Sequence, residues 1–201
     1  MKKARQMLFF LLLITSLLAS ACATTAVTNA WRDPTYQGPI KKVLVIGVSQ
    51  KKAVQRFFED EFVRQLRAAG TDAIAGYTIL PYEEDINKDF IAAKAKESGA
   101  DTVLVTRPLG RTTERTYVPG QVYAVPAPYY RWGSYYGQAY SPGYVVEDEY
   151  VYVETNLFDL QSEKLIWSAQ SETLLSAGNR GLIESFIKTI IAQLSSDKVI
   201  K

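Results

Sequence analysis

The sequence KKVLVIGVS, residues 41–49, decides the fold class of this chain. Its apolar residues follow one another without the polar alternation of a half-exposed strand, so we predict a strand buried on both faces. Strands of this kind occur in parallel sheets whose two faces are covered by helices. The residues that follow should therefore alternate between helices and strands.

The segment up to residue 107 alternates in this way. The first predicted helix has an apolar stripe at three- and four-residue spacing, made of Val54, Phe58, Phe62, Leu66 and Ala69. A short strand over 72–78, a second helix over 88–98 and a third strand over 101–107 follow. Gly70 and Gly99 are predicted to end the two helices in the left-handed conformation. This order of elements indicates a mainly parallel sheet with covering helices.

The pattern changes after the third strand. That strand continues to about residue 118, and strand-forming residues return over 144–160 and over 165–175. Consecutive strands joined by turns are expected to be antiparallel, so we predict a meander on one side of the sheet. The last element is an amphipathic helix over 179–194, with an apolar face of Leu182, Ile183, Phe186, Ile187, Ile190, Ile191 and Leu194. The predicted fold is α/β, a single domain over 41–201 with one mixed sheet: a βαβαβ first half, an antiparallel meander and this C-terminal helix.

The N-terminal residues indicate export from the cytoplasm. Residues 1–21 combine a basic start, an apolar run and small residues before Cys22, which is typical of a signal peptide. The apolar run is too short for a comfortable membrane span. LLASAC, residues 17–22, resembles the lipobox of bacterial lipoproteins, in which the cysteine is acylated and becomes the mature N-terminus.

One position departs from the lipobox, because Ala19 stands where leucine is usual. Ordinary cleavage after residues 19–21 is the alternative, and it would leave a free thiol at Cys22. Ala23 rather than aspartate follows the cysteine, and the resemblance then implies the outer membrane, with the domain facing the periplasm. Residues 22–40, rich in small and turn-forming residues, are predicted to be a lipidated tether.

Composition argues against several classes of protein. The chain has 23 basic and 21 acidic residues; without Lys2, Lys3 and Arg5 of the signal, 20 basic residues stand against 21 acidic ones. No basic excess is left to bind nucleic acid. The absence of histidine excludes His–Cys zinc sites and histidine-dependent nucleophiles. We therefore expect no enzyme activity, no metal, no cofactor and no nucleic-acid partner.

Residues 117–144 have a composition of their own. They hold eight of the thirteen tyrosines and four of the eight prolines, and Arg131 is their one charged residue. Proline lacks the backbone donor that a sheet interior or a membrane strand requires, so we predict a loop at the tip of a hairpin. Tyrosine and tryptophan are enriched in binding hot spots because they offer large contact area with few rotors to freeze. The predicted contact residues are Tyr129, Tyr130, Trp132, Tyr135 and Tyr136.

Three interpretations of this loop stay open at the level of sequence. The tyrosines can fold back over the protein's own sheet. They can bind an envelope protein or a second copy of the chain. They can also contact a glycan or a membrane surface, because aromatic rings stack on sugars and their polar tips suit the membrane–water boundary.

Two other segments carry candidate chemistry. The loop over 47–54 lies where α/β folds bind phosphates, but it lacks the glycine patterns of nucleotide loops. An ordinary turn with Ser49 as helix N-cap is the favoured interpretation. Glu147 and Glu149 are expected on one face of a strand and Asp148 on the other, a set that a carboxylate-based hydrolase or a calcium site would use. A charged edge that discourages pairing with other chains is favoured instead.

The order of elements, together with KKVLVIGV, GADTVLVTR and LFDLQSEKLIWSAQSET, resembles a family of small bacterial envelope lipoproteins. The likeness runs from about Trp31 to the last helix, and its pattern L-x-D-x-x-x-x-K-L-x-W-S spans Leu157–Ser168. This pattern marks a hairpin whose Trp167 packs on the core. The layout more distantly resembles the periplasmic α/β domains of the curli-secretion lipoprotein, of a penicillin-binding-protein activator lipoprotein and of the Tol propeller. Topology alone carries that likeness, so no residue role is transferred.

The sequence thus predicts a lipid-anchored, non-enzymatic binding or scaffolding protein of the bacterial cell envelope that contacts a partner through its aromatic loop. A peptidoglycan- or polysaccharide-binding lipoprotein is the alternative. A hydrolase that uses the carboxylates at 147–149 is the third hypothesis.

Overall fold

The computed structural model describes residues 25–38, 40–81, 88–122, 140–175 and 179–200. In chain order the elements are β1 (Thr25–Arg32), β2 (Lys42–Gly47), α2 (Lys52–Ala68), β3 (Asp72–Ala75), the 3-10 helix η1 (Gly76–Thr78), α3 (Lys88–Glu97), β4 (Thr102–Val118), β5 (Gln121–Val122), β6 (Tyr140–Ser141), β7 (Tyr144–Asp159), β8 (Leu165–Leu174) and α5 (Asn179–Ser196).

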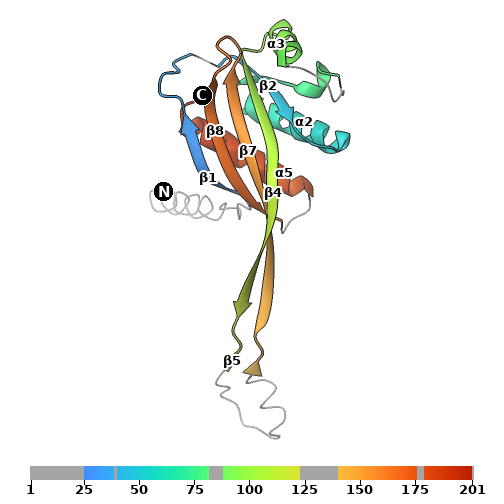
Figure 1. The fold of residues 1–201 in the computed structure, drawn as a ribbon, viewed down its shortest axis with the longest axis vertical. Helices are drawn as coiled ribbons and strands as arrows, with labels where there is room; N and C mark the ends of the chain where they lie inside the picture. Colours follow the sequence, from blue (N-terminus) through green and yellow to red (C-terminus); the bar gives the residue numbers. More distant parts are fainter. Residues whose placement is uncertain (1–24, 39, 82–87, 123–139, 176–178, 201) are drawn as a thin grey trace, which may run out of the picture.

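A mixed sheet of six strands organises the molecule, in the order β1-β8-β7-β4-β2-β3 (Figure 1). Strands β3, β2 and β4 are parallel to one another. Strands β4, β7, β8 and β1 are successively antiparallel. This confirms the predicted α/β class, with a βαβαβ half, an antiparallel meander and a C-terminal helix.

The helices α2 and α3 cover opposite faces of the parallel half. Because β3 and β4 flank β2 on its two sides, the two crossovers run in opposite directions, and right-handed crossovers then place their helices on opposite faces. The packing follows this arrangement. Val43 and Val45 of β2 join the cluster that contains α2, whereas Leu44 between them joins Ala95 of α3. Strand β2 is therefore buried on both faces, as its sequence predicted.

The larger hydrophobic core lies between the sheet and helices α2 and α5. Phe62 and Leu66 of α2 meet Ile187 and Ile190 of α5, and all four side chains are fully buried. Each such side chain contributes about 1.5–3 kcal/mol by leaving water. Trp167 is also fully buried, and its Nε1 donates a hydrogen bond of 2.7 Å to Asp197 Oδ2 beyond the end of α5. The predicted apolar face of the last helix and the core position of Trp167 are confirmed.

Residues 25–32 form an edge strand of the sheet, whereas the sequence predicted that they belong to a tether. β1 pairs antiparallel with β8, and the hydroxyl groups of Thr25 and Thr173 lie 2.9 Å apart in a hydrogen bond. Val27 packs against the main core. β1 thereby satisfies the backbone groups along one edge of β8, which would otherwise be unpaired.

Two smaller boundaries also differ from the prediction. Lys51, not Ser49, is the N-cap of α2, and the Ser49 hydroxyl instead accepts a hydrogen bond of 3.2 Å from the Lys51 amide. The strand expected over 72–78 stops at Ala75, because the chain turns into η1. The predicted left-handed glycines are confirmed, with φ of 86° at Gly70 and 78° at Gly99.

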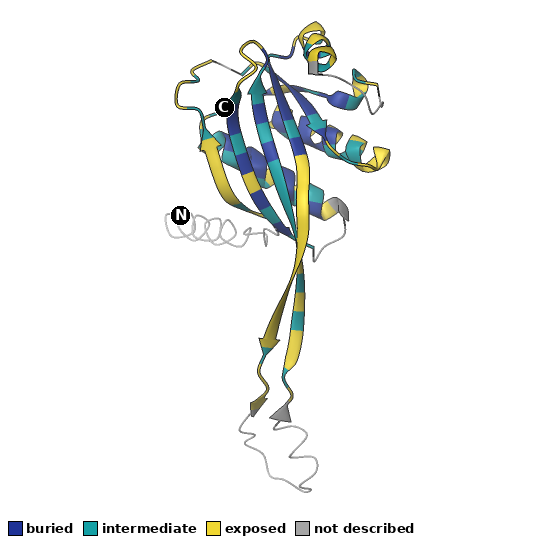
Figure 2. Cartoon of the chain, in the orientation of Figure 1, coloured by how far each residue is buried: buried dark blue, intermediate teal, exposed yellow. Residues whose placement is uncertain are grey.

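Strands β4 and β7 extend far beyond their neighbours in the sheet. β2 accompanies β4 only up to Thr106, and β8 accompanies β7 only back to Tyr150. Beyond those points β4 and β7 pair only with each other and project from the body as a twisted two-stranded ribbon (Figure 1). Figure 2 shows that this ribbon is mostly exposed, in contrast to the buried strand segments of the body.

Candidate functional site

We call Thr113–Val118 of β4 together with Tyr144–Glu149 of β7 the arm. Its register is continuous, from Thr113 opposite Glu149 to Val118 opposite Tyr144. Threonine, valine and tyrosine dominate these two segments, and such residues favour extended backbone. A register shift between Pro108 and Gly110 precedes the arm, and irregularities of this kind bend and twist a strand pair. No third strand stabilises the arm within the part of the chain that the structure describes.

Arginine–glutamate ion pairs line one face of the ribbon. Arg115 Nε lies 2.8 Å from Glu147 Oε1, and Arg111 Nη1 lies 3.2 Å from Glu149 Oε1. Closer to the body, a third pair lies on the other face of β7, where Arg107 Nε is 2.7 Å from Glu154 Oε2. The arginine side chains are 58–72% exposed, so each pair adds little to stability, although opposite charges across a strand pair favour this register.

Two of these ion pairs involve the carboxylates at 147–149, which the sequence offered as candidate chemistry. Glu147 and Glu149 share a face and Asp148 lies on the other, as the strand period predicted. Both glutamates lie on the exposed ribbon and face arginines, as expected for a charged edge. Among the described residues, no group of three or more acidic or cysteine side chains is placed to hold a metal ion.

The other face of the ribbon gathers negative charge near the body. Glu114 lies directly opposite Asp148, an arrangement of like charges that disfavours pairing. Tyr150 is the next residue of β7 on that face. Partial burial, followed by the negative charges of Asp148, Glu114 and Glu172, raises the pKa of the Tyr150 hydroxyl. The part of the arm next to the body, up to the pair of Arg115 and Glu147, is therefore polar on both faces.

The far end of the arm is apolar and exposed. Tyr117, Tyr144 and Val145 are 66%, 59% and 56% exposed. The hydroxyl end of Tyr117 lies against Gly143, and a Cβ atom at residue 143 would have to displace it. Tyr117 and Tyr144 are the two ends of the aromatic segment 117–144, Val145 follows it directly, and all three side chains are open to solvent.

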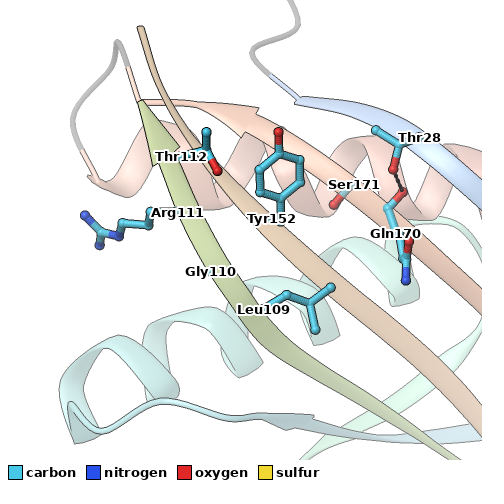
Figure 3. Close-up of a pocket in the computed structure, with 8 residues that line it drawn as sticks. All are labelled: Thr28, Leu109, Gly110, Arg111, Thr112, Tyr152, Gln170 and Ser171. Carbon is cyan, nitrogen blue, oxygen red and sulfur yellow. Dashed lines mark hydrogen bonds between the residues drawn. The ribbon is translucent and has the colours of Figure 1, made fainter. Parts of the chain in front are cut away.

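The face of the sheet opposite α2 and α5 is covered by α3 at its parallel half; we call the rest of it, which no described element covers, the uncovered face. It holds a shallow depression near the base of the ribbon. Its volume is about 250 Å³, below the usual range for small-molecule sites. The eight lining residues, labelled in Figure 3, are Thr28, Leu109, Gly110, Arg111, Thr112, Tyr152, Gln170 and Ser171. They come from β1, β4, β7 and β8, and the sequence does not indicate this surface because it depends on β1 joining the sheet. Trp31 of β1 is also 47% exposed.

A buried carboxylate occupies the carboxyl end of the parallel strands. Glu59 of α2 is fully buried, and its Oε1 accepts hydrogen bonds from the Gly47 amide at 3.0 Å and from Gln55 Nε2 at 2.9 Å. Its Oε2 accepts a hydrogen bond of 2.7 Å from the Tyr77 amide. Burial raises the pKa of Glu59, while these hydrogen bonds oppose the increase.

This carboxylate bears on the phosphate site considered for the loop over 47–54. In α/β folds that bind nucleotides, free backbone amides at this point receive the phosphate. Here the Gly47 amide donates to Glu59 instead. The loop is therefore a turn held by a hydrogen bond to Glu59, in agreement with the ordinary turn that the sequence favoured.

Several predicted functional residues lie outside the described part of the chain. They are Cys22, the predicted lipidation site, and the five predicted contact residues Tyr129, Tyr130, Trp132, Tyr135 and Tyr136. The structure does place both strands that lead into the aromatic segment, Thr102–Val118 and Tyr144–Asp159. The predicted hairpin around that segment is thereby confirmed up to its described ends.

Comparison with known proteins indicates a likeness in fold only. No family model matches the sequence, and no curated protein matches it. Among solved structures, the chain is similar to the PelC dodecamer from Paraburkholderia phytofirmans, with 15% identity and a TM-score of 0.49 over 85% of this chain and 96% of that one. It is also similar to lipoprotein GNA1162 from Neisseria meningitidis, with 15% identity and a TM-score of 0.44 over 78% of this chain and 99% of that one.

These two likenesses are partial and low in identity, so no function is transferred from them. Within the described residues, no helix has the length and apolar content needed to cross a membrane.

Proposed function

We propose that this chain is a lipid-anchored, non-enzymatic binding or scaffolding protein of the bacterial cell envelope. In this proposal Cys22 carries the lipid, the sheet and helices form a rigid body, and the arm with its aromatic segment contacts another component of the envelope. The outer membrane, with the body in the periplasm, is the proposed location. The contact residues in the loop are the five proposed from the sequence, Tyr129 to Tyr136.

The projection of the arm is the observation that carries this proposal. A two-stranded ribbon is marginally stable in water, because it buries little surface of its own. The arm nevertheless continues the strands of the body for another six residues on each side and ends in the exposed residues Tyr117, Tyr144 and Val145. Covering the exposed apolar surface at the end of such a projection would stabilise the arm, because that surface would then leave water.

A glycan-binding lipoprotein is the second candidate, because the uncovered face of the sheet also presents aromatic rings. Trp31 is half exposed, and Tyr152 lines the depression beside the polar side chains of Thr28 and Gln170 (Figure 3). Aromatic rings next to amide and hydroxyl groups suit a sugar ring. Co-sedimentation with purified peptidoglycan that is lost on Tyr152→Ser, and retained on Tyr117→Ser, would favour this candidate over contact through the arm.

Photo-crosslinking in intact cells tests the proposed contact. A photoreactive amino acid replaces Val145 at the end of the arm, and a matched control replaces Lys164, an exposed residue in the turn at the opposite end of the sheet. We expect irradiation to join residue 145, and not residue 164, to a molecule other than the chain itself. Crosslinks from residue 145 only to the chain's own sheet would show that the aromatic segment is a lid, and the proposal would be abandoned.

A further inference from the structure

The first strand of the sheet starts beside the base of the arm. Thr25 of β1 lies opposite Thr173, Thr173 lies opposite Val151, and Val151 lies opposite Arg111. These four residues form one row across the sheet, at the level where β7 leaves β8. Adjacent strands are about 4.8 Å apart, which puts Thr25 about 10 Å from Val151. Figure 1 shows the start of β1 next to the point where the ribbon leaves the sheet.

The direction of β1 places the chain before it on the side of the arm. β1 and β7 are both antiparallel to β8, so they run in the same direction. The chain therefore enters the sheet at Thr25 from the side toward which the arm projects. Cys22 precedes Thr25 by three residues, and covalent geometry limits their separation to about 11 Å.

The end of the arm lies farther from this row of residues than Cys22 can lie from Thr25. From Val151 to Tyr144, seven residues of extended chain span about 23 Å. A lipid on Cys22 holds Thr25 within about 11 Å of the bilayer surface, and Val151, about 10 Å from Thr25 along the row, within about 21 Å. Because the arm projects from the same end of the sheet and its end lies about 23 Å beyond Val151, that end reaches the bilayer.

The distribution of charge along the arm matches contact with a bilayer. The pair between Arg115 and Glu147 is the outermost pair of charged residues, and from Thr116 to Val146 only Arg131 is charged. Among the described residues beyond that pair, the exposed large apolar side chains are Tyr117, Tyr144 and Val145. Tyrosine favours the membrane–water boundary, where its ring leaves water and its hydroxyl stays hydrated. The charged part of the arm thus ends at Arg115 and Glu147, where its apolar end begins.

We propose that the end of the arm, Thr116–Val118 with Tyr144–Val146, inserts into the interfacial layer of the bilayer that carries the lipid anchor. This inference rests on the proposed lipidation of Cys22 and names the envelope component that the arm contacts. The protein is then held to the membrane at two points, with the body standing on the membrane and its opposite end, at the turn before β8, facing away. The uncovered face of the sheet stays free for other partners.

Fluorescence quenching on vesicles tests this orientation. The lipidated full-length chain is purified with Val145→Cys, labelled with a nitrobenzoxadiazole fluorophore, and reconstituted into vesicles of phosphatidylethanolamine and phosphatidylglycerol. Acylation blocks the thiol of Cys22, which is the only native cysteine, so the label attaches at the introduced position. Lys164→Cys is the matched control. A phospholipid with a nitroxide near its headgroup should quench the label at residue 145 several-fold more than the label at residue 164.

The outcomes separate the orientation from the anchor. Flotation of the protein with the vesicles reports on the anchor, and selective quenching reports on the arm. Flotation with equal quenching at residues 145 and 164 would overturn the bilayer contact and leave the anchored protein in place. In that case, crosslinking of residue 145 to a protein would assign the arm to a protein partner or a second copy. Failure to float would remove the anchor and this inference together.

Discussion

Glu59 stabilises the junction between the first two parallel strands. Its two carboxylate oxygens accept hydrogen bonds from the amide of Gly47, the last residue of β2, from the amide of Tyr77 in η1, and from the Gln55 side chain. Gly76 permits this packing, because a Cβ atom there would lie 2.9 Å from the Val45 carbonyl oxygen and 3.4 Å from Glu59 Oε2. A buried carboxyl group with three hydrogen-bond donors thus stabilises the carboxyl end of these strands, where other α/β folds bind ligands.

Glu59→Gln should destabilise the body although it preserves the size of the side chain. An amide has one acceptor oxygen, so its NH2 group must face either the Gly47 or the Tyr77 amide, and one buried donor loses its partner. The expected loss is about 1–3 kcal/mol in the free energy of unfolding, measured by urea denaturation. Glu97→Gln, the same change on the exposed surface of α3, is the control. Equal effects of the two substitutions would show that Glu59 does not brace the strands.

The sequence carried a signal for Glu59 that composition alone hides. Glu59 lies three residues before Phe62 and four before Val63, so it occupies a position of the apolar stripe of α2. A lone charge at such a position indicates a buried polar contact, but its partners come from β2 and from η1, which only the folded sheet brings together. Trp167 is the contrasting case. Its apolar strand context predicted burial correctly, although its hydrogen bond to Asp197 depends on the packing of α5.

At the scale of elements, strong periodicity predicted the fold and weak periodicity did not. The run in β2 and the apolar face of α5 each identify one structure, because their side chains are buried in a regular pattern. β1 lacks such a pattern. Only Thr25 among its residues is buried, and it pairs with Thr173, 148 residues away. The sequence does not show where the six-stranded sheet ends either. β2 and β8 stop there, but the strand pattern of β4 and β7 continues without a change.

The ion pairs of the arm should contribute little to the stability of the body. The double variant Arg115→Ala with Glu147→Ala removes an exposed pair that lies outside the six-stranded region, so the free energy of unfolding should change by less than about 0.5 kcal/mol. Thr155→Val is a control in the same two strands. It removes the buried hydrogen bond of 3.2 Å between the hydroxyls of Thr155 and Thr106 and should cost about 1 kcal/mol.

Urea denaturation of both variants separates arm from body. A loss for the arm variant as large as that for Thr155→Val would mean that the arm and the body unfold as one unit. The arm would then be an integral part of the core, and the argument that it needs an external surface would fail.

At the scale of the whole molecule, a body with two separate cores holds an arm at the end of the sheet where β1 begins. α2 and α5 cover one face of the sheet, α3 covers part of the other, and the arm has no covering element among the described residues. Local opening requires little free energy where few apolar contacts are lost. The body should therefore stay closed while the arm opens readily, until a surface covers its end.

Hydrogen exchange of the full-length chain, free in detergent and in its own membranes, tests this account most directly. In detergent, the amides of the arm, Thr113–Val118 and Tyr144–Glu149, should exchange much faster than those of Thr102–Thr106 in the middle of the sheet. In the native membrane, exchange of the arm should slow several-fold while exchange of the body stays the same. Arm amides that exchange equally fast in both settings would contradict the claim that the arm is the contact element of this protein.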